Sequence, residues 1–297
     1  MPETAPLSTP TAASVAEVVR DTAARLRGAG IADPQVDAEL LVAHVLESSR
    51  GGVQAAAIRG DRMPASASTS LAPLVDRRCA REPLQHLTGR APFRAMELAV
   101  GPGVFVPRPE TEMVAQLAID ALRAVASDAP IAVDLGTGSG AIALAMATEV
   151  PHARVYAAEN SVDAFIWTKQ NHALIGAANL SLAFIDLAEA FPDLDGTVSV
   201  VASNPPYVPD DAIPRDPEVR LFDPPAALYG GPDGLDAVRQ LSRVGLRLAH
   251  PGGTIVIEHG EWQGAAIRDI LTADGWRSAS THPDLTTRDR ATTAIRP

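Results

Sequence analysis

Cysteine is almost absent from this chain of 297 residues, in which Cys79 is the single example. One cysteine excludes an intrachain disulfide and a metal cluster built on cysteines, and it fits a reducing cytoplasm. Long apolar runs are also missing: no segment approaches the length of a membrane helix, and the opening "MPETAPLSTPTAA" lacks a basic start followed by an apolar block. We therefore expect a disordered N-terminal tail, a cytoplasmic location, no metal and no membrane contact.

Positive charge is scarce as well. The 36 acidic residues outnumber the 25 basic ones and give a formal net charge of -11. This balance exerts no overall electrostatic attraction on nucleic acid, so we expect no direct nucleic-acid partner, while a local basic patch stays open. Aromatic residues reach only 4%, but the hydrophobic fraction of 46% is ordinary for a globular protein. The length suits one large domain and a small one.

The first part of the chain is typical of a small helical domain. Apolar residues recur there at helical spacing, Ser14 and Glu17 form a capping-box pattern, and Gly51-Gly52 is placed to end a helix. We expect a domain over residues 1–85 that recognises a substrate or partner, with a purely structural role as the alternative. The expected helices cover residues 14–30, 33–49 and 68–81.

The second part changes to strands that alternate with helices. The segment "PFRAMELAVGPGVFVP", residues 92–107, has short apolar and β-branched stretches broken by Gly-Pro-Gly and predicts a β-hairpin that bridges two domains. After residue 130 the alternation indicates crossover connections and a doubly wound, parallel α/β sheet. We expect residues 86–297 to form this domain. The expected strand segments lie at 130–135, 153–159, 180–186, 197–206 and 253–260, with a final pair within 276–295, and the expected helices at 140–150, 161–174, 234–250 and 263–275.

A glycine-rich loop, "VDLGTGSG", joins the first of these strands to a helix. Glycine lets the backbone approach a ligand closely, and a helix N-terminus offers unpaired N–H groups to an anionic group. Glu159 stands about twenty residues further on, at the next strand end, where a carboxylate can accept hydrogen bonds from two ribose hydroxyls. A cofactor that contains a nucleoside is predicted. The loop residues are Asp134, Gly136, Thr137, Gly138, Ser139 and Gly140.

The loop alone leaves the choice of cofactor open. Gly136, Gly138 and Ala141 satisfy the dinucleotide pattern G-x-G-x-x-G/A, so an NAD-binding site and a tight turn without ligand both stay as alternatives. Asp134, two residues before the first glycine, favours S-adenosylmethionine, because enzymes that use it commonly carry an acidic residue there. Asp186 then lies near the adenine, or it simply caps the helix that follows.

The stretch "SNPPYV" stops the fourth strand of the series abruptly. Proline fixes φ and has no N–H group, so Pro205 and Pro206 force the chain out of the sheet. Asn204 remains at the carboxyl end of a parallel strand, where open α/β sheets bind their ligands. Its side-chain oxygen and the Pro205 carbonyl are two acceptors suited to a planar NH2 group, on which Tyr207 can stack. The alternative is a rigid turn.

A planar NH2 group is a poor nucleophile, because its lone pair is delocalised into the adjoining π-system. Alignment with an electrophilic methyl group, and acceptors that strengthen as positive charge develops on nitrogen, promote its methylation. The proton can leave after the transfer. We therefore expect no dedicated general base, and we interpret His86 and His259 as packing or surface residues.

Taken together, these motifs resemble class I S-adenosylmethionine-dependent methyltransferases, in which NPPY is shared by enzymes that methylate glutamine amides and enzymes that methylate adenine amines. The segment "EPLQHLTGRAPFRAMELAVGPGVFVPRPETEMV", residues 82–114, closely resembles HemK/PrmC-type release factor glutamine methyltransferases, of which "PRPETE" is a strong signature. The later "DPPAALYGGPDGLDAVRQL" and "HPDLTTRDR" resemble that family too. The resemblance spans nearly the whole chain.

This resemblance implies a seven-stranded Rossmann-like sheet and a helical N-terminal domain. It implies S-adenosylmethionine as cofactor and, as substrate, the glutamine of the Gly-Gly-Gln motif in class 1 translation release factors. The residues implied for the cofactor are Asp134, Gly136 to Gly140, Glu159, Asp186, Leu187 beside the adenine, and Asn204. The residues implied for catalysis and the glutamine are Asn204, Pro205, Pro206 and Tyr207, with Arg108, Glu110 and Glu112 ordering the wall of the site or forming an interdomain salt bridge.

The chain departs from the family at two positions. The family usually has aspartate in place of Glu159 and often an aromatic residue in place of Leu187, which affects the expected cofactor affinity and not the reaction type. Three other functions stay open: an adenine methyltransferase acting on nucleic acid, a catalytically silent module that docks on release factors, and an NAD-dependent oxidoreductase.

Overall fold

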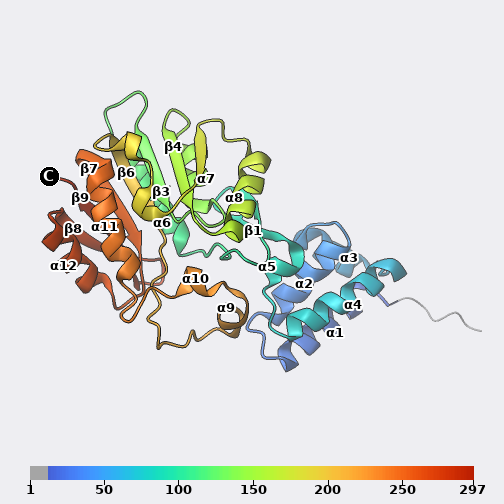
Figure 1. The fold of residues 1–297 in the computed structure, drawn as a ribbon. Helices are drawn as coiled ribbons and strands as arrows, with labels where there is room; N and C mark the ends of the chain where they lie inside the picture. The colour runs from blue at the N-terminus through green and yellow to red at the C-terminus, as the bar shows by residue number, and fades with distance from the viewer. Residues whose placement is uncertain (1–12) are drawn as a thin grey trace, which may run out of the picture. The chain divides into compact units, whose positions relative to one another are not determined.

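The computed structural model describes residues 13–297, which form two compact units divided between Thr88 and Gly89. Figure 1 shows one unit made of helices and one built around a sheet. The boundary expected after residue 85 lies inside the last helix of the first unit. The tail expected at the N-terminus lies outside the described residues.

The first unit buries the apolar stripes of its helices against one another. The expected capping box is present, since the Ser14 side chain accepts from the backbone of Glu17 and the Glu17 side chain accepts from the backbone of Ser14. Leu26, Leu41 and Val53 belong to the shared core. The described helices are α1 (Val15–Gly28), α2 (Pro34–Val45), α3 (Arg50–Arg59), α4 (Ala65–Cys79) and α5 (Leu84–Thr88).

The prediction that Gly51-Gly52 ends the second helix is wrong. That helix ends at Val45, and the two glycines lie in the first turn of α3, which was not expected. Ser49 explains the difference, because its side chain accepts a hydrogen bond from the Gly52 N–H group at 3.0 Å and caps the new helix. The first N–H groups of a helix have no partner within the helix, so a capping serine there offsets the poor helix propensity of glycine.

The second unit contains the expected doubly wound sheet, and the α/β fold class is confirmed. The sheet has seven strands in the order β5-β4-β3-β6-β7-β9-β8. Strands β3 to β7 run parallel, while β9 pairs antiparallel with both β7 and β8. The strands are β3 (Ile131–Leu135), β4 (Arg154–Glu159), β5 (Leu180–Phe184), β6 (Val198–Ser203), β7 (Ala249–Glu258), β8 (Arg277–Pro283) and β9 (Asp289–Ile295).

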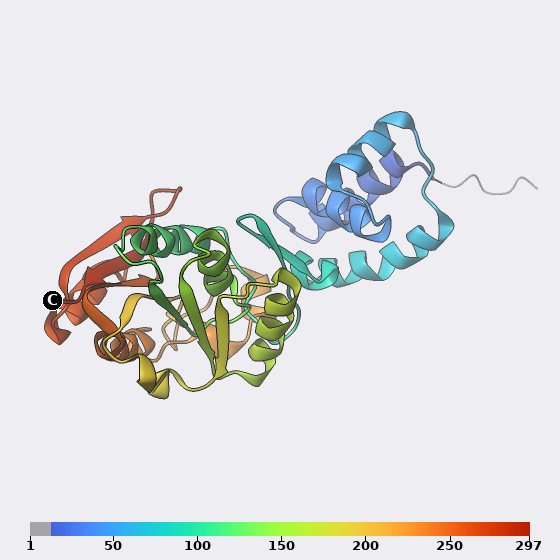
Figure 2. The same cartoon turned by 90° about the horizontal axis from the view of Figure 1, so that it is seen from above.

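Helices cover both faces of this sheet, as Figure 2 shows from above. Side chains alternate across a strand, so Ala132 and Val200 pack under α6 and α7, whereas Val133 and Val201 pack under α11 and α12. Helices α6, α9 and α10 were not expected from the sequence. The helices are α6 (Thr111–Arg123), α7 (Ala141–Glu149), α8 (Val162–Ile175), α9 (Pro217–Phe222), α10 (Pro225–Leu228), α11 (Asp236–Leu248) and α12 (Gly264–Asp274).

The expected hairpin exists but is shorter than 92–107. It consists of β1 (Arg90–Phe93) and β2 (Met96–Ala99), and the chain beyond it is irregular up to α6. A Cβ atom on Gly101 would lie 2.5 Å from the Trp167 ring, so any side chain at position 101 would clash with this residue of α8. Ala99 pairs with Arg90, the first residue of β1, so the chain beyond Ala99 has no strand partner and its backbone at Gly101 packs against a side chain of α8.

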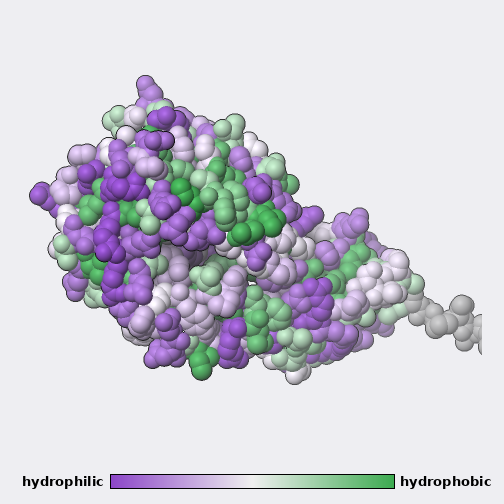
Figure 3. Space-filling view, viewed as in Figure 1, coloured by the Kyte–Doolittle hydropathy of each residue, from purple (hydrophilic) through white to green (hydrophobic). Residues whose placement is uncertain are grey.

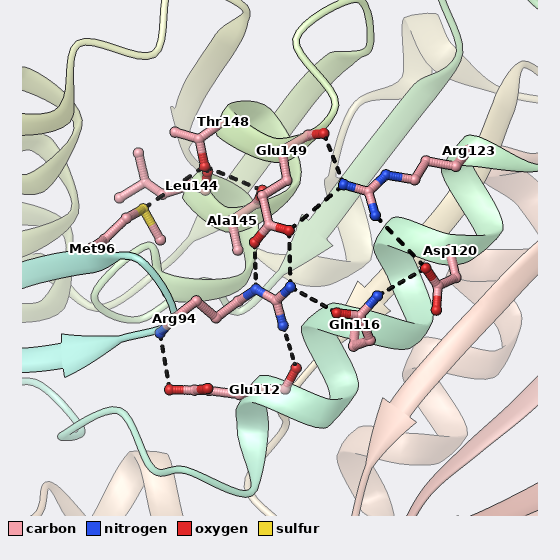
Figure 4. Close-up of polar contacts among 10 residues, drawn as sticks. All are labelled: Arg94, Met96, Glu112, Gln116, Asp120, Arg123, Leu144, Ala145, Thr148 and Glu149. Carbon is pink, nitrogen blue, oxygen red and sulfur yellow. Dashed lines mark hydrogen bonds and ion pairs between the residues drawn. The ribbon is translucent and has the colours of Figure 1, made fainter.

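Arg94 anchors the turn of the hairpin to the sheet domain. Figure 4 shows its guanidinium fork on the Glu149 carboxylate at the end of α7, with a further hydrogen bond of 2.7 Å to Gln116 on α6. The Arg94 backbone N–H donates to Glu112 at 2.9 Å. The guanidinium holds the pKa of Glu149 below its usual range. Because bidentate pairs fix geometry, the hairpin has one defined position on this unit.

Candidate active site

A cavity of about 540 Å³ opens at the carboxyl ends of the parallel strands, within the second unit. The molecular surface is hollowed on this side (Figure 3). Open α/β sheets bind ligands at this edge, where the strand order reverses. Most of the residues proposed from the sequence line this one cavity; they are Arg108, Glu110, Gly136, Thr137, Gly138, Ser139, Glu159, Asp186, Leu187, Asn204, Pro205, Pro206 and Tyr207. Asp134 and Gly140 belong to the same glycine-rich segment but do not line the cavity.

The glycine loop forms one end of the cavity. Gly136 and Gly138 have φ of 72° and 59°, and a Cβ atom on either would point into open space. A side chain there would therefore be strained and would fill the cradle that the bare backbone leaves. Helix α8 holds the loop from outside: the Thr168 hydroxyl donates to the Gly138 carbonyl at 2.6 Å, and the Asn171 amide to the Ser139 carbonyl at 2.9 Å.

Asp134 lies at the end of β3 beneath the loop. Its Oδ2 atom accepts from the Thr137 hydroxyl at 2.6 Å and from the Ala143 N–H group at 3.1 Å, so the carboxylate ties the loop to the first turn of α7. Its Oδ1 atom is buried without a protein partner. Burial raises the pKa of Asp134 to about 7, and the nearby Glu159 charge adds to the shift.

Glu159 ends β4 and is buried beside the loop. Its Oε2 atom accepts from the Gly138 N–H group at 2.8 Å, and its Oε1 atom accepts from the N–H groups of Asn160 and Ser161 at 3.0 and 2.8 Å. Three backbone donors fix the orientation of this carboxylate. A carboxylate has about four lone-pair positions, so capacity for a ligand hydroxyl remains.

Asp186 and Leu187 form the next part of the wall, after β5. Asp186 caps the short helix η1 (Leu187–Glu189), because its Oδ1 atom accepts from the Ala188 N–H group at 2.9 Å. Its Oδ2 atom accepts from the Asn160 amide at 3.0 Å. The capping alternative is thus realised, although Asp186 also lines the cavity.

Asn204 stands at the other end of the cavity, directly after β6. Its amide nitrogen donates to the Thr111 hydroxyl of α6 at 3.3 Å, and the Glu258 carboxylate at the end of β7 is nearby. The nitrogen is therefore turned toward the wall. Because the nitrogen is used in this way, the oxygen is the atom of the amide that is left to accept from a ligand.

The turn that follows is braced by a segment about thirty residues further along the chain. A Cβ atom on Gly230 would lie 2.4 Å from the Pro206 carbonyl oxygen, and one on Gly234 would lie 2.3 Å from the Tyr207 carbonyl oxygen. The Gln263 amide donates to the same Tyr207 oxygen at 2.9 Å. Close backbone approach to Pro206 and Tyr207 thus explains the glycines at 230 and 234.

Arg108 and Glu110 belong to the wall. Arg108 pairs with the buried Asp223 carboxylate at 2.8 Å and lies over the Phe105 ring. Glu112 accepts from Arg94 within the same unit. These partners favour wall ordering over the interdomain salt bridge that the sequence left open.

The cavity also has lining residues that the sequence analysis did not propose, among them Thr111, Phe105, Glu258 and Arg290. For Glu258 a signal existed, because the strand "GTIVIEHG" ends in a carboxylate next to the NPPY strand in the sheet. Burial raises the pKa of Glu258 to about 7. Burial also raises the pKa of the Tyr207 phenol, with Glu258 adding to the shift.

His259 is buried and hydrogen bonds to the Gly260 carbonyl and the Thr292 hydroxyl, each at 2.8 Å. It does not line the cavity, and this fits the packing role expected for it. Within residues 13–297, no group of three or more His, Cys, Asp or Glu side chains is arranged to hold a metal ion. Nor does that part of the chain contain a helix of the length and apolarity needed to cross a bilayer.

Two protein families match consecutive parts of the chain. Residues 17–89 match the PrmC N-terminal domain, and residues 95–223 match the methyltransferase small domain. A crystal structure of a methyltransferase from Pyrococcus furiosus has the same fold, with a TM-score of 0.50 at 18% identity over 68% of this chain and 90% of that one. The doubly wound sheet and the matched domain define a methyltransferase.

Relatives of similar length identify the family. A release factor glutamine methyltransferase of Streptomyces coelicolor is 49% identical over 282 residues, covering 94% of this chain and 97% of the relative. The chain belongs to the release factor glutamine methyltransferase family. A 4-amino-L-phenylalanine/4-methylamino-L-phenylalanine methyltransferase of Streptomyces pristinaespiralis is 37% identical over 294 residues, 97% of each chain. Both names describe methylation of nitrogen-bearing substrates.

Proposed function

We propose that this protein transfers a methyl group from S-adenosylmethionine to the side-chain amide nitrogen, N5, of the glutamine in the Gly-Gly-Gln motif of class 1 peptide chain release factors. The names of its relatives support the substrate. The observation that carries the proposal is the orientation of Asn204, whose amide nitrogen donates to Thr111, so that its oxygen is left to accept from a ligand in the cavity.

The glycine-loop end of the cavity fits the methyl donor. The cradle at Gly136 and Gly138 and the unpartnered Oδ1 atom of Asp134 suit a polar ligand that approaches the backbone closely. Glu159 is proposed to hold the ribose, and Leu187 to flank the adenine. When bound there, S-adenosylmethionine supplies an electrophilic methyl group on a positively charged sulfur. Family membership favours this cofactor over the nicotinamide dinucleotide left open by the loop pattern.

The NPPY end of the cavity would orient the substrate amide. Its two N–H groups would donate to the Asn204 side-chain oxygen and the Pro205 carbonyl, while Tyr207 stacks on the planar group. Such a clamp fixes the direction of the nitrogen, which converts a bimolecular encounter into a nearly unimolecular step. Both acceptors also strengthen as positive charge develops on nitrogen. The glycines at 230 and 234 and the Gln263 amide hold this turn in place.

The proposed substrate implies a cytoplasmic location, because translation termination occurs there, and the helical unit is proposed to recognise the release factor. A nucleic-acid substrate fits the chain less well, because its acidic residues outnumber its basic ones. A silent docking module fits less well than an enzyme, because the acceptor and cradle ends meet in one cavity.

The test is incubation of the purified protein with a class 1 release factor and labelled S-adenosylmethionine, followed by peptide mass spectrometry. We expect one methyl group on the glutamine of Gly-Gly-Gln and none when that residue is alanine. Parallel reactions contain 4-amino-L-phenylalanine or nucleic acid. Label in either of these and not in the release factor would overturn the proposal, and binding of the release factor without any transfer would identify a docking module.

A further inference from the structure

Two large apolar side chains are exposed beside the NPPY end of the cavity and have no role in the proposed function. Trp262, in the turn that follows β7, is 85% exposed, and Leu285, between β8 and β9, is fully exposed. Neither residue lines the cavity. Tryptophan is highly buried on average and is enriched at the energetically dominant positions of protein interfaces. We call Trp262 and Leu285 the rim pair.

The turns that carry the rim pair are neighbours at the same edge of the sheet. The His259 N–H group donates to the Arg290 carbonyl at 2.9 Å, which continues the pairing of β7 with β9 beyond the end of β7. Further out, Arg288 pairs with Glu261 at 3.7 Å. Because β9 begins where β7 ends, both turns lie at the edge onto which the cavity opens. The rim pair therefore belongs to one region of the surface.

Gln263 joins the turn at Trp262 to the NPPY turn. Its side-chain oxygen accepts from the Gly260 N–H group at 2.9 Å, and its own N–H group donates to the Gly260 carbonyl at 3.0 Å, so this turn is closed by two hydrogen bonds. Its side-chain nitrogen donates to the Tyr207 carbonyl at 2.9 Å, and Tyr207 lines the cavity. The surface at Trp262 is thus continuous with the end of the cavity at which the substrate amide is proposed to bind.

The turn at Leu285 is also fixed by its own hydrogen bonds. The Asp284 Oδ1 atom accepts from the Thr286 N–H group at 2.7 Å, from the Thr286 hydroxyl at 2.6 Å and from the Arg288 N–H group at 3.1 Å. A side chain presented by an ordered turn loses little backbone freedom when a partner covers it, and this preorganisation favours binding. Both members of the rim pair are therefore exposed apolar groups on ordered turns.

We propose that the rim pair is a docking contact for the polypeptide that carries the modified glutamine, and that Trp262 and Leu285 pack against apolar side chains of the release factor outside the cavity. The inference rests on the proposed function, and it adds a second recognition surface to the one proposed for the helical unit. The NPPY oxygens hold only a side-chain amide, so the chain that bears this amide has to lie across the mouth of the cavity.

Continuity with the cavity favours the substrate over a second copy of this chain as the occupant of the rim pair. The Trp262 turn contacts the NPPY turn through Gln263, and Arg290, just beyond the Leu285 turn, lines the cavity. A second copy seated there would lie against the end of the cavity that the substrate has to enter.

The first test is steady-state kinetics with intact release factor. We expect Trp262→Ala to raise KM for the release factor about 10-fold, and Leu285→Ala to raise it about 3-fold, because a large aromatic contact contributes more than an aliphatic one. The kcat and the dissociation constant for S-adenosylmethionine should stay at the wild-type values, since neither side chain lines the cavity. Trp262→Phe keeps an aromatic ring and should recover most of the loss in KM.

Leu174→Ala is the matched control. Leu174 is 63% exposed near the end of α8, which leads to the start of β5 at the opposite edge of the sheet. Its substitution removes an exposed apolar side chain away from the cavity. We expect this variant to keep the wild-type KM for the release factor.

Fluorine NMR gives a readout that does not depend on activity. The chain has three tryptophans. Trp276 is buried, and the Trp167 ring nitrogen donates to the Pro102 carbonyl at 3.2 Å. In protein labelled with fluorotryptophan, the signal that is missing from Trp262→Phe belongs to position 262. We expect this signal to shift when unlabelled release factor is added, and to stay in place when free glutamine is added.

The inference is overturned if Trp262→Ala and Leu285→Ala both keep the wild-type KM, or if the signal of position 262 does not move at saturating release factor. A wild-type dimer that Trp262→Ala dissociates, with KM unchanged, would assign the rim pair to a second copy of this chain and overturn the inference as well. Cofactor binding by each variant shows that it is folded. Failure of the proposed function looks different: the wild-type protein would then transfer no methyl group to release factor.

Discussion

The two ends of the cavity are built in different ways. At the glycine loop, neighbouring stretches of chain fix a bare backbone: Asp134 and Glu159 accept from its N–H groups or its threonine, and Thr168 and Asn171 donate to its carbonyls. At the NPPY turn, the fixing groups come from three distant segments. They are Thr111 before the sheet, the glycines at 230 and 234, and Gln263 beyond β7.

This difference separates binding from orientation. The loop end presents mainly backbone groups to a ligand, and these are the same whatever the side chains are. Such a site suits a cofactor shared by many enzymes. The NPPY end presents two oxygens whose directions depend on contacts across the whole sheet domain. Substitutions at the first end should therefore act mainly on cofactor affinity, and substitutions at the second mainly on turnover.

Asn204→Ala should give the largest effect. In the proposed function the substrate amide loses an acceptor that strengthens in the transition state, so we expect kcat to fall about 100-fold to 1,000-fold. Cofactor affinity should stay mostly intact, as single-turnover methylation and calorimetry would show. Equal losses of turnover and cofactor binding would contradict the separation of the two ends.

Glu159→Ala should act at the loop end. It removes the carboxylate that accepts from Gly138 and is proposed to hold the ribose, and we expect the cofactor dissociation constant to rise about 10-fold to 100-fold. Glu189→Ala is the control, because Glu189 is exposed on the neighbouring η1 turn. A dissociation constant equal to that of the wild type would show that the ribose is held by other groups.

Gly234→Ala tests whether the NPPY oxygens need their brace. Gly234 has φ of 74°, and a Cβ atom would clash with the Tyr207 carbonyl oxygen at 2.3 Å. Gly252 shares a positive φ of 82° but has open space around it. Backbone strain of about 1 kcal/mol should appear in urea unfolding of both alanine variants. We expect only Gly234→Ala to lose kcat as well, and an equal loss in the two would assign the effect to strain.

Arg94→Lys should give the smallest effect. Lysine keeps the charge but cannot reproduce the fork that joins Glu149 to Gln116, so we expect a loss of about 1 kcal/mol in the free energy of unfolding. Arg123→Lys, at a more exposed partner of Glu149, should cost less. Neither variant should alter the cofactor dissociation constant, and a change there would mean that the hairpin turn affects the glycine loop.

Much of the fold was predictable because regular elements carry local signals. Strands β3 to β7 and helices α7, α8, α11 and α12 follow from apolar runs that alternate with helical spacing. The early end of the hairpin was not predictable, since the packing of Gly101 against Trp167 of α8 joins residues far apart in the sequence. Helix α3 was not predicted, because Gly51 and Gly52 are typical of a helix end, whereas the capping role of Ser49 is evident only in the structure.

The candidate site was predictable where a sequence motif has a physical explanation that depends only on its own residues. The glycine loop and the NPPY turn combine backbone constraints with polar groups at strand ends, and both line one cavity. Thr111 could not be found in this way, because a threonine at the start of a helix has no local feature that separates it from an ordinary capping residue. Only the approach of α6 to the end of β6 gives it Asn204 as a partner.

Asn171 of α8 also has a mechanical consequence. Its buried side chain exchanges two hydrogen bonds with the backbone of Ala99, at the end of the hairpin, and gives a third to Ser139 in the glycine loop. One carboxamide thus connects the last residue of β2 directly to the glycine loop of the cavity. A displacement of β2 would therefore reach this loop through Asn171 rather than through the strands of the sheet.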